Sequence, residues 1–224
     1  MMAHEVSSFE RALAPLQAEI AVFDLLGGRL HRPHLARTDL VLLGGSGAYS
    51  AAIGGPWFAS ALNSLRTVHD SGVPAFASCW GFQAMAVAMG GRVVQDRSRA
   101  EVGTHRVFLT AEARRDPVFG GLPPSFAAQM GHEDLVEELP PRTTLLASSD
   151  AVVNQAYRFE DAPIYCTQFH PELDSAGLLA RLSTYPRYAA EVTGASFQEI
   201  VDRVEDTPAA NQLVRLFVEN FVRG

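Results

Sequence analysis

Two short apolar segments, each ending in small residues, constrain the fold of this chain most strongly. Asp39–Leu43 runs into the glycine-rich turn Gly44–Gly47, and Val73–Ala77 runs directly into the apolar helical segment Gly81–Met89. A further helical pattern, Trp57–Asp70, separates the two segments. Buried strands that alternate with helices predict a parallel sheet whose faces are covered by helices.

The second half of the chain has short strand-like segments separated by Gly, Pro or Asp. This spacing predicts antiparallel strands. We therefore expect one α/β domain over residues 1–224, with a flavodoxin-like, mostly parallel sheet flanked by helices and antiparallel additions in the second half. The expected strands are Arg92–Gln95, Thr104–Thr110, Ser125–Gln129, Thr144–Ala147, Gln155–Phe159 and Ile164–Phe169. The helices expected after them are Ser175–Leu182, Phe197–Val204 and Ala209–Val222.

The N-terminal segment predicts a helix followed by a strand. Ser7 and Glu10 have the spacing of a capping box, so we expect a helix over Ser7–Gln17. Ile20–Leu26 then reads as a strand that the glycine pair Gly27–Gly28 ends. The apolar residues with helical spacing are Phe9, Leu13, Leu16 and Ile20.

The composition fits a folded, acidic protein. Of 224 residues, 47% are hydrophobic and 19% are charged, and the formal net charge is -7. The negative charge argues against non-specific binding to nucleic acid or to an anionic membrane. No apolar run approaches the roughly 18 residues of a membrane span, and the N-terminus has no signal-peptide pattern. Two cysteines, Cys79 and Cys166, do not make a disulfide framework and predict free thiols in a cytoplasmic protein.

Cys79 lies where a predicted strand meets a predicted helix, in Ala77-Ser-Cys-Trp-Gly81. Small residues two before and two after the cysteine permit a sharp elbow that projects the sulfur above the carboxyl end of the sheet. The helix N-terminus also stabilises a thiolate. A buried structural thiol is the alternative for any free cysteine, and it is our interpretation of Cys166, which lies within a strand.

A thiolate nucleophile requires a base, and the base requires an orienting group. His170-Pro171-Glu172 supplies both, directly after the strand Ile164–Phe169. Pro171 favours an extended conformation at His170, and residues two apart in an extended segment share a face. We therefore expect His170 and Glu172 to form a hydrogen-bonded pair aimed at Cys79. The alternative is a strand end with a polar histidine and a surface glutamate.

Two segments, Cys79-Trp-Gly-Phe-Gln83 and Gln168-Phe-His-Pro-Glu172, together resemble the class I, or triad, glutamine amidotransferases. The resemblance is to the branch that includes the glutaminase domain of GMP synthase, and it extends from about Asp39 to Leu173. The family carries Cys-x-Gly-x-Gln and then His-Pro-Glu, each at the end of a strand. The resemblance implies an enzyme that hydrolyses the side-chain amide of glutamine through a cysteine thioester, with no metal and no organic cofactor.

The resemblance also implies roles for individual residues. Cys79 is the expected nucleophile, His170 the general base and acid, and Glu172 the orienting carboxylate.

The substrate-binding residues that the resemblance implies are Gly44, Gly45, Trp80, Gln83 and His132. A backbone N–H of the Gly44–Gly45 turn would form an oxyanion hole with the N–H of Trp80, and Gln83 would help to hold glutamine. His132, within Met130-Gly-His-Glu-Asp134, would line the pocket, and a solvated turn is the open alternative for it.

Two positions depart from the family pattern, since Ala77 replaces a more usual Gly and Ser46 stands where many members have Pro. No segment resembling an acceptor-activating domain is present, so we expect ammonia to pass to a separate acceptor enzyme, such as a synthetase subunit. One alternative is a γ-glutamyl hydrolase or peptidase with the same triad. Another is a regulatory subunit that is inactive without its partner.

Folds of this kind begin with a strand inside the sheet, whereas Met1–Glu5 contains no apolar run. We expect that this first strand is missing before residue 6, because coding sequence precedes Met1 or because the sheet has a gap. A shorter sheet that closes over the vacancy is the alternative.

Other chemistry is weakly indicated. His31-Arg-Pro-His34 could form a metal-binding pair, but no third ligand is evident in the sequence. Gly44–Gly47 lacks the patterns of a phosphate-binding loop. We therefore expect neither a metal nor a nucleotide.

Overall fold

A computed structural model of the chain describes residues 2–16, 18–184, 191–192 and 194–222. The strands are β1 Val41–Leu43, β2 Ala75–Ser78, β3 Arg92–Gln95, β4 Glu101–Leu109, β5 Ser125–His132, β6 Asp134–Glu138, β7 Thr143–Ser148, β8 Ala156–Phe159 and β9 Ile164–Thr167. The α-helices are α1 Met2–Leu13, α2 Arg32–Leu35, α3 Phe58–Ser71, α4 Trp80–Ala88, α5 Ser175–Thr184, α7 Phe197–Val201, α8 Pro208–Asn211 and α9 Leu213–Phe221.

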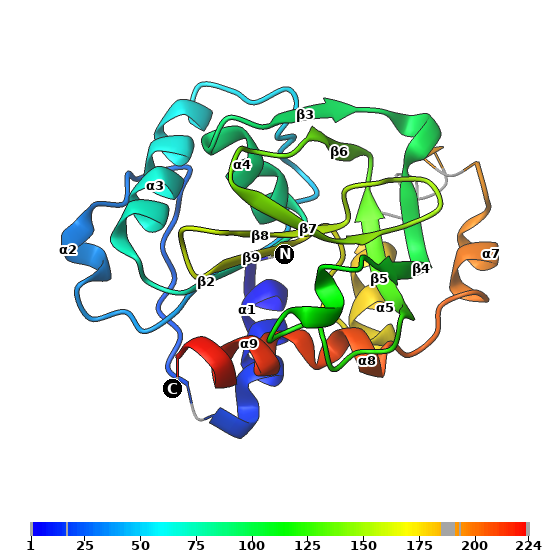
Figure 1. The fold of residues 1–224 in the computed structure, drawn as a ribbon. Coiled ribbons are helices and arrows are strands. Elements are labelled where there is room, and N and C mark those ends of the chain that lie inside the picture. The colour runs from blue at the N-terminus through cyan, green and yellow to red at the C-terminus, as the bar shows by residue number, and fades with distance from the viewer. Residues whose placement is uncertain (1, 17, 185–190, 193, 223–224) are drawn as a thin grey trace.

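The main sheet combines parallel and antiparallel strands, in the order β1-β2-β9-β8-β7-β4-β5 (Figure 1). The pairs β1–β2 and β2–β9 are parallel, and the remaining neighbours pair antiparallel. The expected fold, with parallel strands first and antiparallel additions in the second half, is confirmed, although the antiparallel part is larger than expected. β3 pairs with β6 in a separate small sheet, and β6 was not predicted.

Helices cover both faces of the parallel strands (Figure 1). Phe76 of β2 packs against Phe217 of α9, with ring centroids 5.6 Å apart, on the face that α1 also covers. The adjacent residues Ala75 and Ala77 face the opposite side, where α3 and α4 pack. This alternation buries both faces of β2 and fixes the register in which β2 delivers Cys79 to its carboxyl end.

The N-terminal helix begins earlier than its sequence pattern predicts. α1 starts at Met2, so Ser7 is no cap but lies inside the helix, and its hydroxyl donates to the carbonyl of His4 at 3.0 Å. The helix ends at Leu13 and a 3₁₀ turn follows it. The predicted burial of Phe9 and Leu13 is confirmed.

The strand expected over Ile20–Leu26 is wrong. The Asp24 carboxylate accepts the N–H of Leu26 at 2.9 Å, and the Asp24 carbonyl accepts the N–H of Gly28 at 3.1 Å. These local bonds form a turn in place of a strand.

β1 is consequently the edge strand of the main sheet. Residues 2–6 belong to α1 and supply no inner strand beside it. A cavity of about 380 Å³ lies between α1, the segment 20–23 and the turn that follows β1. The expectation that an inner strand is missing at this place stays a prediction.

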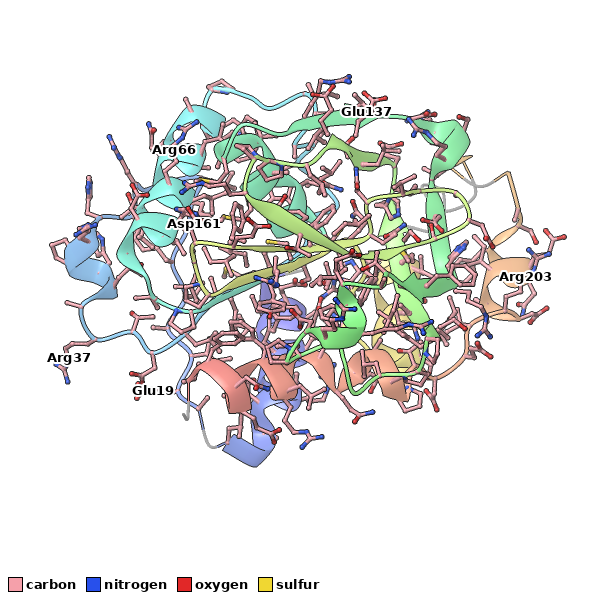
Figure 2. All side chains as sticks on the ribbon, viewed as in Figure 1. Glu19, Arg37, Arg66, Glu137, Asp161 and Arg203 are labelled. Carbon is pink, nitrogen blue, oxygen red and sulfur yellow. The ribbon has the colours of Figure 1, made fainter. Side chains whose placement is uncertain are left out.

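Charged side chains lie at the surface, as the negative net charge and the large apolar fraction require. The labelled residues of Figure 2 lie on the outer elements of the fold: Glu19, Arg37, Arg66, Glu137, Asp161 and Arg203. Within the described ranges, no helix has both the length and the apolar character needed to cross a membrane.

The packing of α9 on β2 leads to a stability prediction. Phe217 is 0% exposed and also contacts Tyr165, with ring centroids 5.4 Å apart. Replacing Phe217 with alanine should lower the free energy of unfolding by about 3–5 kcal/mol, because the lost contacts leave a cavity. Urea denaturation measures this change. The exposed Glu219 of the same helix provides the control, since Glu219→Ala should change stability by less than about 0.5 kcal/mol. Equal effects of the two substitutions would contradict the assignment of Phe217 to the core.

Candidate active site

Cys79 occupies a strained corner between β2 and α4. Its backbone has φ 50° and ψ −106°, a conformation that costs a non-glycine residue about 1–3 kcal/mol. The N–H of Cys79 donates to the carbonyl of Thr167 at 2.8 Å, which extends the pairing of β2 with β9 to the corner itself. Because both strands are buried, the sheet holds the corner in this conformation, and the thiol lies at the N-terminus of α4 as expected.

Gly81 allows the corner to pack against the turn that follows β1. A Cβ atom at Gly81 would lie 2.6 Å from Cβ of Leu43 and 2.7 Å from its carbonyl oxygen. The N–H of Gly81 donates to the carbonyl of Gly44 at 3.2 Å. The small residue therefore permits a close contact that ties the glycine turn to the elbow.

His170 and Glu172 form the expected pair, but on a turn. Nδ1 of His170 lies 2.7 Å from Oε1 of Glu172. β9 ends at Thr167, and the N–H of Leu173 donates to the carbonyl of His170 at 3.2 Å, which closes a turn over Pro171. The predicted extended conformation is thus wrong, because proline also fits the second position of a turn, and the turn brings the two side chains together.

The turn is held from two sides. The N–H of His170 donates to the carbonyl of Gln129 in β5 at 2.9 Å. The side-chain amide of Asn211 in α8 donates to the carbonyls of Pro171 and Leu173, at 2.9 and 2.7 Å. These contacts fix the imidazole in place before any substrate arrives.

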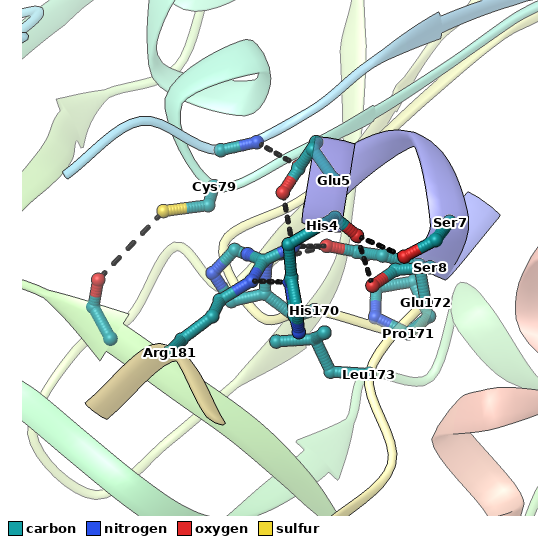
Figure 3. A network of polar contacts seen from close by, with 12 residues as sticks. His4, Glu5, Ser7, Ser8, Cys79, His170, Pro171, Glu172, Leu173 and Arg181 are labelled. Atoms are coloured by element: carbon teal, nitrogen blue, oxygen red, sulfur yellow. Dashed lines mark hydrogen bonds and ion pairs between the residues drawn. The ribbon is translucent and has the colours of Figure 1, made fainter. Parts of the chain in front are cut away.

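The electrostatics of His170 favour the charged imidazolium. Burial alone would lower its pKa, but the negative charges of Glu172 and Cys79, and hydrogen bonds to both, raise the pKa to about 10. In Figure 3 the imidazole lies between Cys79 and Glu172. Since the ordinary value is 6.5, this charge stabilises the fold fully below about pH 6.5, and its contribution is lost as the pH rises through about 10.

Arg181 of α5 completes the charge balance. Its guanidinium forms an ion pair with Glu5 and lies 3.6 Å from Oε1 of Glu172. Nη1 of Arg181 is 3.2 Å from Nδ1 of His170. Both of these nitrogens are donors when His170 is protonated, so the hydrogen bond of Nδ1 goes to Glu172 and the arginine is a close neighbour. The charges of His170 and Arg181 together lower the pKa of Glu172 against the opposing effect of burial.

Gly45 lies directly against the reactive side chains. A Cβ atom there would be 2.7 Å from Cε1 of His170 and 3.4 Å from Cβ of Cys79, so only glycine fits. The N–H of Gly45, however, donates to Oε1 of Glu5 in α1 at 2.6 Å. Trp80 is the first residue of α4, so its N–H has no partner within that helix. The two expected oxyanion donors therefore flank Cys79, and one of them is bound to a carboxylate.

A cavity of about 230 Å³ opens beside Cys79. Its lining includes the segment 46–50, Gln83 and the β5–β6 hairpin. The amide of Gln83 donates to the carbonyl of Asp134 at 2.9 Å and to Oε1 of Gln168 at 3.1 Å. Gln83 thus joins α4 to the hairpin at the wall of the cavity.

His132 lines the same cavity but is almost wholly buried. Its Nε2 lies 3.3 Å from a carboxylate oxygen of Glu101, which also accepts from Ser149 and Gln155. Burial alone would raise the pKa of Glu101, but the hydrogen bond and charge of His132 lower it. The solvated turn considered for His132 is therefore wrong, and the side chain belongs to a buried polar network that supports the hairpin.

Asp134 fastens the loop over the cavity. Its Oδ2 accepts from the hydroxyl of Ser50 at 2.6 Å and from the N–H of Ala52 at 3.1 Å. The sequence motif contained Asp134 but gave no reason to assign it a contact, since Ser50 lies 84 residues earlier.

Two further residue groups are accounted for by structure alone. Cys166 is 0% exposed in β9, and burial raises the pKa of its thiol, as expected of a structural cysteine. Nδ1 of His34 accepts the N–H of His31 at 2.9 Å, so this pair caps α2. Among the described residues, no group of three or more His, Cys, Asp or Glu side chains is placed to hold a metal ion.

Glu5 and Arg181 were not predicted as site residues. Arg181 carried a usable signal, since it shares a helix face with the buried Leu178 and a charged residue on an apolar face requires a partner. Glu5 carried none, because only the tertiary packing of α1 brings it to Gly45.

Comparison with known proteins supports this arrangement. One component of the glutamine-hydrolyzing GMP synthase of Methanopyrus kandleri, a separate polypeptide, is 35% identical over 122 residues, which cover 54% of this chain and 64% of that protein. The glutamine-hydrolyzing GMP synthase of Caldicellulosiruptor saccharolyticus is 36% identical over 108 residues, which cover 48% of this chain and 20% of that protein. These matches span less than two thirds of each relative, and they agree with the expected GMP synthase-like branch.

The fold has a solved counterpart. The crystal structure of a glutamine amido transferase from Methylobacillus flagellatus has a TM-score of 0.76 at 23% identity, with 96% of this chain and 87% of that chain covered. The family model described as glutamine amidotransferase class-I matches residues 6–177, which is most of the chain. The chain therefore belongs to the class I glutamine amidotransferases.

Proposed function

We propose that the chain hydrolyses the side-chain amide of glutamine to glutamate and ammonia, with Cys79, His170 and Glu172 as a catalytic triad. The observation that carries this proposal is the buried pair of His170 and Glu172, 2.7 Å apart, beside a cysteine at a strained elbow. The family match supports the reaction class, and the geometry supports the assignment of the three residues.

The first half of the reaction forms a thioester. The Cys79 thiolate attacks the carbonyl carbon of the side-chain amide, and the carbonyl electrons move onto oxygen. His170, held as imidazolium, donates its proton to the leaving nitrogen, so that ammonia departs as the carbon–nitrogen bond breaks. The second half reverses the roles: the neutral imidazole takes a proton from water, the resulting hydroxide attacks the thioester, and glutamate leaves.

Stabilisation of the oxyanion falls to the backbone. The N–H groups of Gly45 and Trp80 lie on either side of Cys79, where two donors would bind a tetrahedral oxyanion. This assignment requires the N–H of Gly45 to be free of Glu5 during the reaction.

The cavity favours a small substrate. Its volume of about 230 Å³ is below the roughly 300–1,000 Å³ typical of sites for drug-sized ligands. Gln83 and His132 line it, and we assign them to the support of the glutamine pocket. A bulky γ-glutamyl amide would have to extend out of the cavity.

The destination of the ammonia follows from the relatives. The Methanopyrus relative is named as one component of GMP synthase, and the longer relatives carry sequence that this chain does not match. We propose that ammonia passes to a separate acceptor enzyme, a synthetase that binds this chain.

The nucleophile assignment predicts a difference between the two cysteines. Replacing Cys79 with alanine should lower glutamine hydrolysis by about a thousandfold or more, because no other group can form the thioester. Cys166→Ala, which removes the other thiol from the core, should retain activity. Release of ammonia and glutamate from glutamine measures both variants. Full activity of Cys79→Ala would disprove the proposal, and faster turnover of γ-glutamyl peptides than of glutamine by the unmodified chain would favour a peptidase.

The orienting carboxylate predicts a change in pH dependence. Replacing Glu172 with glutamine removes the largest influence that raises the pKa of His170, so this pKa should fall from about 10 toward or below its ordinary 6.5. The imidazolium is then lost near neutral pH. The glutamine turnover at about pH 7.5 should fall by about a hundredfold or more, and the alkaline limb of the pH profile should move to lower pH.

The matched control is Glu160→Gln. Glu160 is exposed and follows β8 at the end of the sheet opposite to Cys79. This variant should keep the profile of the unmodified protein. An unchanged alkaline limb in Glu172→Gln would contradict the role of Glu172.

A further inference from the structure

The N-terminal helix reaches into the candidate active site through one side chain. Oε1 of Glu5 accepts the N–H of Gly45 at 2.6 Å, across 40 residues of sequence (Figure 3). The proposed function assigns this same N–H to the oxyanion. A regulatory role for Glu5 therefore rests on that proposed function and deepens it.

Glu5 is held in place by a second contact. Its other oxygen, Oε2, forms an ion pair with Nη2 of Arg181, and these two side chains are 17% and 11% exposed. Nε of Arg181 also lies 3.4 Å from Nδ1 of His4, so two residues of the first turns of α1 contact the same guanidinium. The carboxylate is therefore a fixed occupant of the site and not a freely rotating surface group.

A carboxylate and an oxyanion cannot share this donor. A Cβ atom at Gly44 would collide with the Glu5 side chain, which shows how closely the carboxylate lies against the glycine turn. One N–H supplies one strong hydrogen bond, and a second negative charge at this distance would be repelled. Burial and the charge of Glu172 already raise the pKa of Glu5 despite Arg181.

The end of α1 that carries Glu5 is loosely attached. The buried residues Phe9 and Leu13 anchor the later part of the helix, whereas Met2 is 68% exposed. The cavity of about 380 Å³ beside Glu5 gives the side chain space to move without displacing Phe9 from its buried position. Withdrawal of the carboxylate thus requires the loss of few contacts.

We propose that Glu5 is an autoinhibitory latch: in the resting enzyme its carboxylate occupies the N–H of Gly45, and catalysis requires that carboxylate to leave. Arg181 retains the released carboxylate near the site. The chain alone is then a slow glutaminase, and anything that draws the first turn of α1 away from Gly45 accelerates it.

The test compares Glu5→Ala and Glu5→Gln with the full-length chain. The control is Glu10→Ala, which changes an exposed acidic residue of the same helix. Two probes of Cys79 are used beside glutamine hydrolysis. A diazo-ketone analogue of glutamine carries a carbonyl that requires the oxyanion donors, whereas iodoacetamide alkylates a thiolate without them.

Glu5→Ala should raise both kcat for glutamine and the rate of diazo-ketone labelling by about tenfold or more, since a charge-assisted hydrogen bond no longer competes. Glu5→Gln should give a smaller increase, because the amide oxygen still accepts but carries no charge. The rate of alkylation by iodoacetamide and its pH profile should stay unchanged in both variants, which shows that His170 and Cys79 are undisturbed. Glu10→Ala should match the unmodified chain in every assay.

Three results would overturn the proposal. Unchanged or slower turnover in Glu5→Ala and Glu5→Gln, with normal iodoacetamide reactivity, would assign Glu5 a supporting role in place of an inhibitory one. If thermal unfolding shows that Glu5→Ala is not folded, the isosteric Glu5→Gln decides, and no increase in that variant is equally negative. Failure of the diazo-ketone to label Cys79 in any variant, while iodoacetamide does label it, would overturn the proposed function and the latch together.

Discussion

The site depends first on a backbone constraint at Cys79. A positive φ at a non-glycine residue persists only where the surroundings fix it, and here β2 is paired on both sides and buried on both faces. The bond from the N–H of Cys79 to Thr167 and the contact of Gly81 with Leu43 fix the corner from opposite directions. The fold thus concentrates conformational strain at the one position where a thiol must project from the sheet.

Charge organises the remainder of the site. His170 is buried yet charged, which is possible because Glu172 and Cys79 carry compensating negative charge. Arg181 adds a second positive charge next to Glu172, and Glu5 adds a third negative group within hydrogen-bond distance of Gly45. Such a set is balanced only when every member is present, which makes the charge state of the site responsive to the position of α1.

The catalytic motifs could be predicted from sequence because their geometry is local. The elbow follows from small residues on both sides of Cys79, and the pair of His170 and Glu172 follows from their spacing, although the chain there turns and is not extended. The strand expected over Ile20–Leu26 failed because its apolar residues found no neighbouring strand and Asp24 formed a turn. The ion pair of Arg181 with Glu5 joins residues 176 positions apart, a relation that no local pattern contains.

The central claim is that Cys79 forms a covalent γ-glutamyl thioester. The most direct measurement mixes the chain with glutamine, quenches the reaction with acid after a short interval, and examines the proteolytic peptides by mass spectrometry. The account predicts a mass increase of one γ-glutamyl group on the peptide that contains Cys79, and none on the peptide that contains Cys166. Hydrolysis of glutamine with an adduct on Cys166 alone would contradict it, as would turnover with no adduct on either cysteine under conditions where the thioester is stable.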